Sequence, residues 1–259
     1  TLHSDLPDLI AYAEGLGLIT GLNTNGRLLS DYGFLAELVS SGLDHVQITI
    51  ESHNEAIHNR ITGASSAWAQ TVAGILNALT SPLYVMTNTT LLTSNVAYLE
   101  DLLNFLAELG VKTVGLNALI YSGSGLNVQT GFPEEELPAL LDKAKLICEQ
   151  NNQRLIWYTP TQYCHFNPIQ MELGVKGCTA ALYNMCIEPN GDVLQCQSYY
   201  EPLGNILIDK WDSIWKHPLA VDLRERRSVP FECVTCELLN ECGWGCPLAR
   251  KANKTAHPR

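Results

Sequence analysis

Seven of the nine cysteines lie between residues 178 and 246, separated by short gaps. Twelve residues separate Cys178 from Gly191, four more lead to Cys196, and Cys186 lies between. Further along, the chain reads Cys-x2-Cys-x5-Cys-x3-Cys from Cys233 to Cys246. Thiolates repeated at such gaps can converge on one soft metal centre, because a short turn brings neighbouring sulfurs within ligating distance. The spacing therefore predicts metal binding in this part of the chain.

Two kinds of metal centre fit these thiolates. The four cysteines of the 233–246 run could make one closed tetrahedral zinc site, and by ligand type alone zinc is at least as favoured as iron–sulfur. A typical zinc ribbon, however, pairs two short cysteine knuckles across a longer gap, which this run does not do. The three cysteines between residues 178 and 196 also need a role, and they could complete a second, polynuclear centre with one shared thiol. Both interpretations remain open on spacing alone.

Length and composition set the class of protein that carries these cysteines. A chain of 259 residues can bury a full-sized core, as one large domain or as one domain with a smaller module. Its net charge of -11 argues against binding to nucleic acid or to an anionic membrane. No apolar run approaches the length of a membrane span, and the first residues do not form a signal peptide. An odd number of crowded cysteines fits reduced ligands in the cytoplasm better than a disulfide framework.

The first part of the chain alternates between two patterns. Helical apolar spacing predicts helices over residues 5–16, 30–41, 66–79, 95–109 and 133–150. Strand-like segments lie between them, at residues 18–24, 45–50, 83–88, 113–120 and 154–158. Strands that alternate with helices of about a dozen residues indicate a parallel sheet with right-handed crossovers. The pattern leaves open a doubly wound sheet or a barrel, whole or partial.

The alternation stops after Pro160, which predicts a boundary between a region 1–160 and a region 161–259. Residues 161–177 are irregular. Cys186 to Cys196 read as a β-hairpin around Asn190-Gly191, since Asn-Gly favours a tight hairpin turn. Residues 203–205 suggest another turn, and residues 208–226 a helix whose apolar stripe could pack on the module.

Polar residues gather where the predicted parallel strands end, which is where ligands bind in such sheets. Each of them alone is better explained as a turn or cap residue, but several together suggest a polar cofactor or substrate site. They are Asn23, Thr24, Asn25, Glu51, Ser52, His53, Asn88, Thr89, Thr90, Asn117, Tyr121, Ser122 and Gly123. No phosphate-loop or dinucleotide-binding fingerprint accompanies them.

The cysteine pattern resembles the seven-cysteine SPASM module that follows the partial barrel of many radical S-adenosylmethionine enzymes. Neighbouring residues match as well, in segments 187–196, 203–205 and 242–246. The upstream half resembles the radical S-adenosylmethionine barrel at Thr24-Asn25-Gly26, at residues 48–52 and at residues 58–63. The resemblance covers essentially the whole chain. It implies an α/β fold in which a partial (β/α)6 TIM-like barrel (residues 1–160), missing its first strands, precedes a small SPASM-type module of β-hairpins and helices (residues 161–259).

The resemblance also implies ligands for one or two auxiliary [4Fe–4S] clusters. One would be held by Cys178, Cys186, Cys196 and Cys246, and a second by Cys233, Cys236 and Cys242. In the family the second cluster takes its fourth ligand from a cysteine beyond the last motif, but the thirteen residues after Cys246 contain none. An open iron, His257, Cys164 or a further stretch of chain are the alternatives.

S-adenosylmethionine itself would be approached by residues at strand ends. The resemblance implies this role for Asn25, Thr49, Glu51, Asn88 and Asn117. The signature Cys-x3-Cys-x2-Cys, which holds the cofactor-cleaving [4Fe–4S] cluster, is absent from the chain, as is the Gly-Gly-Glu-Pro turn. A partial barrel without its first strands would expose apolar sheet edges, so we expect an incompletely represented N-terminus.

The implied function is that of a radical S-adenosylmethionine oxidoreductase or maturase. A reduced cluster would pass an electron to the cofactor, and the resulting 5′-deoxyadenosyl radical would abstract hydrogen from a peptide, protein or small-molecule substrate. A reductant such as ferredoxin or flavodoxin is the expected partner, and the residues single out no catalytic side chain. The alternative is a non-catalytic iron–sulfur or zinc protein, serving in electron transfer or binding, that has lost the cleaving site.

Overall fold

The computed structural model describes residues 1–253, apart from the side chain of Asn253. Its contacts divide the chain into two units, which are described separately. The first unit contains Thr1–Ala118 and Thr130–Tyr158, and the second contains Leu119–Gln129 and the chain from Thr159 onward. Within the described residues, no helix combines the length and the apolarity needed to cross a membrane.

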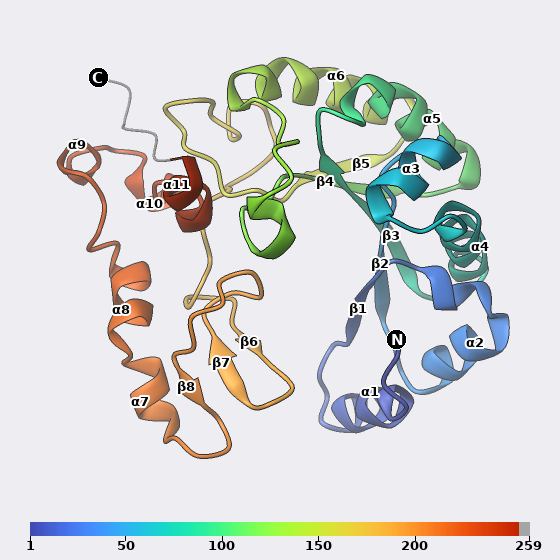
Figure 1. Ribbon diagram of the computed structural model, residues 1–259, viewed down its shortest axis with the longest axis horizontal. Helices are drawn as coiled ribbons and strands as arrows, with labels where there is room; N and C mark the ends of the chain where they lie inside the picture. The colour runs from blue at the N-terminus through green and yellow to red at the C-terminus, as the bar shows by residue number, and fades with distance from the viewer. Residues whose placement is uncertain (254–259) are drawn as a thin grey trace. The chain divides into compact units, whose positions relative to one another are not determined.

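The first unit is built on a sheet of five parallel strands (Figure 1). In order across the sheet they are β1 (Gly21–Thr24), β2 (His45–Thr49), β3 (Tyr84–Leu91), β4 (Thr113–Ala118) and β5 (Arg154–Trp157). Spatial order follows chain order without reversal, so the described sheet has no point at which the winding switches sides, as a doubly wound sheet requires. This order is that of successive barrel strands, and it resolves the choice that the sequence pattern left open.

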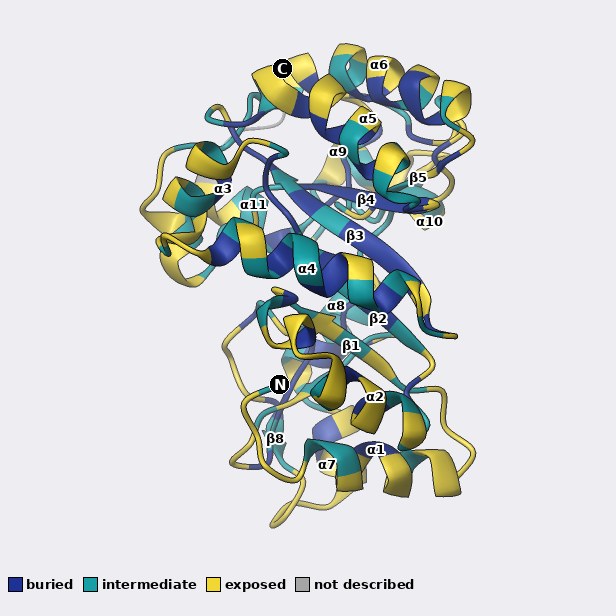
Figure 2. Ribbon diagram, turned by 90° about the vertical axis from the view of Figure 1, so that its right-hand side faces the viewer, coloured by how far each residue is buried: buried dark blue, intermediate teal, exposed yellow. Residues whose placement is uncertain are grey.

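Helices connect the strands and cover one side of the sheet, and Figure 2 shows α4 lying across it. They are α1 (Leu6–Gly15), α2 (Tyr32–Ser40), α3 (Glu55–Thr62), α4 (Ala67–Leu79), α5 (Leu99–Leu109) and α6 (Leu137–Gln150), with short 3-10 turns η1 (Arg27–Ser30), η2 (Val96–Tyr98) and η4 (Glu134–Glu136). The five predicted helices are confirmed. Helix α3 was not predicted. Its N-cap Asn54 accepts a hydrogen bond from the Ile57 N–H at 3.2 Å, and Gly63 ends it with φ 70°.

The two faces of the sheet differ in character. Side chains alternate along a strand, and the register sets Thr49 beside Asn88 and Asn88 beside Gly115. The opposite face carries the apolar set and is fully buried under the helices, with Val46, Ile48, Val114 and Leu116 among its members. Polar side chains are thereby collected on the face that the helices leave uncovered, which corresponds to the inside of a barrel.

The second unit carries a small antiparallel sheet and a run of short helices. Its strands are β6 (Cys186–Ile187), β7 (Asp192–Leu194) and β8 (Gly204–Asn205), and its helical turn near the start is η3 (Gly123–Leu126). The helices are α7 (Trp211–Trp215), α8 (Pro218–Glu225), α9 (Phe231–Val234), α10 (Leu239–Cys242) and α11 (Pro247–Asn253). Ala181, Val193, Leu203, Ile214 and Ala220 form the apolar cluster beneath them.

The predicted hairpin from Cys186 to Cys196 is confirmed, and so is the packing of the apolar stripe, since Leu219 and Leu223 contact that cluster. Two local predictions are wrong. The helix expected over residues 208–226 is divided into α7 and α8, because Pro218 brings no N–H and begins a new helix. The turn expected at residues 203–205 contains β8, whose Asn205 side chain donates to Asn190 O at 2.9 Å.

Candidate functional site

The β6–β7 hairpin fixes two of the predicted ligands. Cys186 begins β6 and faces Leu194 of β7, two residues before Cys196. The hairpin closes at Gly191, whose N–H donates to Glu188 O at 2.8 Å and whose φ of 91° suits glycine. Burial, then the carboxylate of Glu188, then the thiol of Cys196 raise the pKa of Cys186. The short hairpin therefore brings the two thiols within electrostatic range of each other.

Cys178 and Cys246 join this pair from distant parts of the second unit. Burial raises the pKa of Cys178, and the negative charges of Cys246 and Cys196 raise it further, while the Arg250 guanidinium lowers it. Burial and then Cys246 likewise raise the pKa of Cys196. A small pocket of about 30 Å³ borders Cys178 and is lined by Arg250. Cys178 and Cys196 thus lie within electrostatic range of Cys246, and Arg250 lies near Cys178. We name Cys178, Cys186, Cys196 and Cys246 the first thiol group.

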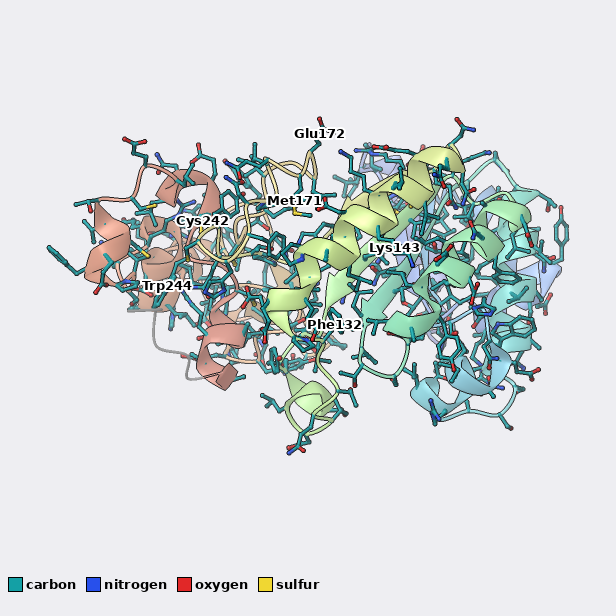
Figure 3. The ribbon with its side chains drawn as sticks, turned by 90° about the horizontal axis from the view of Figure 1, so that it is seen from above. Phe132, Lys143, Met171, Glu172, Cys242 and Trp244 are labelled. Atoms are coloured by element: carbon teal, nitrogen blue, oxygen red, sulfur yellow. The ribbon has the colours of Figure 1, made fainter. Side chains whose placement is uncertain are left out.

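A left-handed turn separates Cys242 from Cys246. Figure 3 labels Cys242 and Trp244, the middle residue of this turn. Its three residues all have positive φ: 59° at Gly243, 62° at Trp244 and 69° at Gly245. A non-glycine residue in this region costs roughly 1–2 kcal/mol. The Arg250 guanidinium stacks 3.7 Å from the Trp244 ring centroid and donates to Trp244 O at 3.3 Å. These contacts stabilise the turn between Cys242 and Cys246. Cys242 lies near Cys233, and Cys246 lies near Cys178.

The second predicted set lies around α9 and α10. Cys233 is in α9, the Cys236 N–H donates to Cys233 O at 3.1 Å, and Cys242 ends α10. Burial raises the pKa of Cys233, followed by the charges of three thiols, those of Cys164, Cys242 and Cys236 in that order. The structure therefore brings Cys164 to the three cysteines of the motif. His257, the other side chain considered as a ligand, lies outside the described residues.

The donor set of both groups fits iron–sulfur clusters. All nine cysteines lie within the described residues and none forms a disulfide. In that same part of the chain, no three His, Cys, Asp or Glu side chains stand close enough to hold one metal ion. In a four-iron cluster each thiolate binds a different iron, so the sulfurs stand further apart than the four ligands of one zinc ion. Cysteine thiolates are the usual ligands of such clusters, so the residue types of both groups fit them.

Glu51 follows β2 and is buried. Its carboxylate accepts a hydrogen bond from the Thr90 N–H at 3.1 Å, and its own N–H donates to His58 Nδ1 at 3.1 Å. Burial raises the pKa of Glu51 to about 7, although the Thr90 hydrogen bond opposes that rise. Asn95 was not singled out from the sequence, yet its amide donates at 2.9 Å to both Glu51 O and Thr90 O. The Asn95 side chain thereby links the residue after β2 to β3, and no local sequence pattern predicts this role.

Two asparagines place unpartnered oxygens on neighbouring strands. Within the described residues, Asn88 Oδ1 and Asn117 Oδ1 are buried and accept no hydrogen bond. The Asn117 amide nitrogen is used, since it donates to Ala118 O at 2.9 Å. Buried amide oxygens normally have a donor, and leaving one without is costly. These oxygens therefore fit a ligand that brings N–H or O–H groups.

The other predicted cofactor contacts have different surroundings. Thr49 is the register partner of Asn88 and lies on the same face of the sheet. Asn25 is engaged within its own loop: its side chain accepts from the Arg27 N–H at 3.1 Å, and its carbonyl oxygen accepts from the Thr71 hydroxyl at 2.8 Å. The structure places Thr49, Glu51 and Asn117 at the ends of neighbouring strands, with Asn25 shaping the adjacent loop. The strand predicted to end at Asn88 continues to Leu91, so Asn88 lies inside β3 and faces the same side as its register partner Thr49.

Comparison with known proteins adds a family match. Residues 178–237 match the SPASM family, described as an iron–sulfur cluster-binding domain. The chain is 24% identical over 264 residues to the AdoMet-dependent heme synthase of Oleidesulfovibrio alaskensis, which covers 95% of this chain and 67% of the relative. It is 27% identical over 256 residues to the PqqA peptide cyclase of Xanthomonas euvesicatoria, covering 94% and 66%. The chain therefore spans about two thirds of the length of the curated relatives it matches.

Solved structures share the fold. Streptococcus suis SuiB bound to the precursor peptide SuiA superposes with a TM-score of 0.77 at 17% identity, over 98% of this chain and 60% of SuiB. The anSMEcpe protein with bound AdoMet and the Cp18Cys peptide gives a TM-score of 0.64 at 15% identity, over 92% of this chain and 69% of that one. At these identities the likeness establishes the fold alone, and it confirms the predicted fold class.

Proposed function

We propose that this chain, which belongs to the radical S-adenosylmethionine proteins with a SPASM domain, works in an oxidoreductase that modifies a peptide. The observation that carries the proposal is the match of residues 178–237 to an iron–sulfur cluster-binding domain, whose motif cysteines lie within one unit. Further support comes from two relatives, one named a PqqA peptide cyclase and one solved with a bound precursor peptide. Since the chain spans about two thirds of the curated relatives, the activity is proposed for a protein of their full length.

The cofactors that the fold implies are iron–sulfur clusters and S-adenosylmethionine, which supply one-electron and radical chemistry when bound. The chain's own residues would bind and orient them. The first thiol group would hold one auxiliary cluster, with Arg250 offsetting part of its negative charge. Cys233, Cys236 and Cys242 would hold a second. Iron is preferred to zinc because residues 178–237 match a domain described as iron–sulfur cluster-binding.

On neighbouring strands, Asn88 Oδ1 and Asn117 Oδ1 would accept hydrogen bonds from the amino and hydroxyl groups of S-adenosylmethionine. Thr49 offers a hydroxyl beside Asn88. With a pKa of about 7, Glu51 can hold or release a proton near neutral pH. Because Glu51 is buried, water has little access to its carboxyl group.

Metal analysis tests the first part of the proposal. The chain is produced anaerobically, reconstituted with iron and sulfide, and assayed for iron and zinc. We expect about eight irons per chain, corresponding to two four-iron clusters. Zinc without iron would contradict the proposal.

Activity is tested in the complete reading frame that contains this chain. Under chemical reduction we expect conversion of S-adenosylmethionine to 5′-deoxyadenosine, measured by chromatography. If the clusters form but no 5′-deoxyadenosine appears, the protein is an electron carrier or binding module. Mass spectrometry of short peptides encoded beside the gene, co-expressed with the protein, then tests the substrate class.

A further inference from the structure

The irregular segment before the SPASM match contacts the second set of cysteines directly. The Tyr163 N–H donates to Cys242 Sγ at 3.3 Å, and the Cys242 thiol donates to Thr161 O at 3.6 Å. The sulfur of Cys242 therefore lies against the backbone of residues 161–163. Cys164 is the next residue along the chain.

Packing fixes this segment. The Tyr163 side chain is buried, and its hydroxyl accepts from the Lys176 N–H at 2.8 Å. Phe166 is buried on the other side of Cys164. Residues 161–163 also pack closely against residues 242–246, because a β-carbon at Gly245 would lie 2.9 Å from Gln162 Cγ. Cys164 is thus held between two buried aromatic residues rather than on a loose loop, while its own side chain is exposed.

Cys164 also lies within electrostatic range of Cys233. Among the charged neighbours that raise the pKa of Cys233, Cys164 has the largest effect, ahead of Cys242 and Cys236. The hydrogen bonds of residues 161–163 to Cys242 thus bring Cys164, the next residue, to the second set of cysteines.

We propose that Cys164 is the fourth protein ligand of the second auxiliary cluster, completing a set with Cys233, Cys236 and Cys242. This inference rests on the proposed function, since it requires that the three motif cysteines hold a cluster. It assigns the ligand that the spacing left unaccounted for to a residue on the N-terminal side of the motif. With four thiolates every iron has a protein ligand, so this cluster serves electron transfer and does not bind substrate at an open iron.

The test isolates the second cluster. Cys178→Ala and Cys196→Ala together remove two ligands of the first thiol group, leaving a chain that should bind about four irons. Adding Cys164→Ala should lower the iron content by at least a quarter and change the electron paramagnetic resonance spectrum, toward the signal of an oxidised three-iron centre. Cys148→Ala serves as the control, because Cys148 is buried in α6 of the first unit and should leave iron and spectrum unchanged.

Folding is checked in the otherwise wild-type chain. There, Cys164→Ala should retain the first cluster, and thus at least about four irons, because the exposed Cys164 side chain contributes little to packing. If Cys164→Ala keeps both the iron content and the spectrum of the parent, Cys164 is not a ligand and the inference fails. If the wild-type chain binds no iron at all, the proposed function fails first.

Discussion

Asn88 and Gly115 are register partners on β3 and β4, and a β-carbon at residue 115 would lie 3.1 Å from Asn88 Oδ1. Gly115 has no side chain to press on that oxygen, which accepts no hydrogen bond within the described residues. The pair thus combines an unpartnered acceptor with a glycine over which the Tyr158 ring packs closely, at 2.5 Å from where a β-carbon would lie. Natural cores rarely keep such an acceptor without a use.

Asn88→Leu should separate stability from binding. Removing a buried, unpartnered amide oxygen should raise the free energy of unfolding by ~1 kcal/mol, measured by urea denaturation. The same change should weaken S-adenosylmethionine binding in the complete protein about tenfold, or ~1.4 kcal/mol, measured by calorimetry. Asn104→Leu is the control, since Asn104 is exposed on α5 and hydrogen bonds to Asn151. Unchanged affinity in Asn88→Leu would exclude Asn88 from the binding site.

Gly115→Ala should place a β-carbon between Asn88 and the Tyr158 ring. The new β-carbon would lie 2.5 Å from Tyr158 Cε2 and 3.1 Å from Thr87 O, so the Tyr158 ring must move. Overpacking of this kind typically costs about 1–3 kcal/mol, to be measured as a loss of unfolding free energy. Gly15→Ala, at the end of α1, is the matched control, because its β-carbon would meet nothing within 4 Å. Equal stability of the two variants would show that the sheet relaxes without strain at residue 115.

Much of the fold could be predicted because its signals are local. The β-branched run at 45–50 and the apolar period of 99–109 identify their elements without tertiary information. Helix α3 was missed because it carries few apolar residues and depends on its caps at Asn54 and Gly63. Strand β8 was missed because two residues are too short for a pattern and pair only once β7 is in place.

The candidate site likewise has a part that the sequence predicts and a part that only the structure shows. Spacing brought out the motif cysteines, since short turns limit how far their thiols can separate. Spacing could not decide between Cys164 and the other candidates for the fourth ligand, because residues 161–177 have no periodicity and take their course from contacts such as Tyr163 with Lys176. The unpartnered oxygens of Asn88 and Asn117 likewise become visible only when neighbouring strands are in register.

Glu51→Gln should change how stability depends on pH. Burial raises the folded-state pKa of Glu51 from 4.5 to about 7, so the unfolded chain releases its proton first. In the wild type this contribution lowers stability as pH rises from about 4.5 to 7, by up to ~3 kcal/mol. The glutamine variant should therefore match the wild type near pH 5 and exceed it at pH 8, as measured by urea denaturation at both pH values.

The comparison must be made between variant and wild type, because His58 acts in an overlapping range. Burial lowers the folded-state pKa of His58 from 6.5 to about 4, so its contribution is lost as pH falls through that range. Both chains keep His58, and its effect cancels in the difference. Glu100→Gln controls for a carboxylate that is exposed beside Lys143. A constant difference between Glu51→Gln and wild type at pH 5 and pH 8 would contradict the raised pKa of Glu51.

Arg250→Met should lower the reduction potential of the cluster proposed for the first thiol group. The guanidinium lies near Cys178 and Cys246, and a nearby positive charge favours the added electron. Arg250→Lys keeps the charge but loses the planar stacking on Trp244, so it should retain most of the reduction potential. This variant distinguishes the effect of the charge from the effect of the turn that Arg250 supports. Arg227→Met removes an arginine that is exposed beside Glu225 and should leave the potential unchanged. The potentials are measured by redox titration followed by electron paramagnetic resonance. An equal fall in Arg250→Met and Arg250→Lys would assign the effect to the Trp244 turn instead of to the charge.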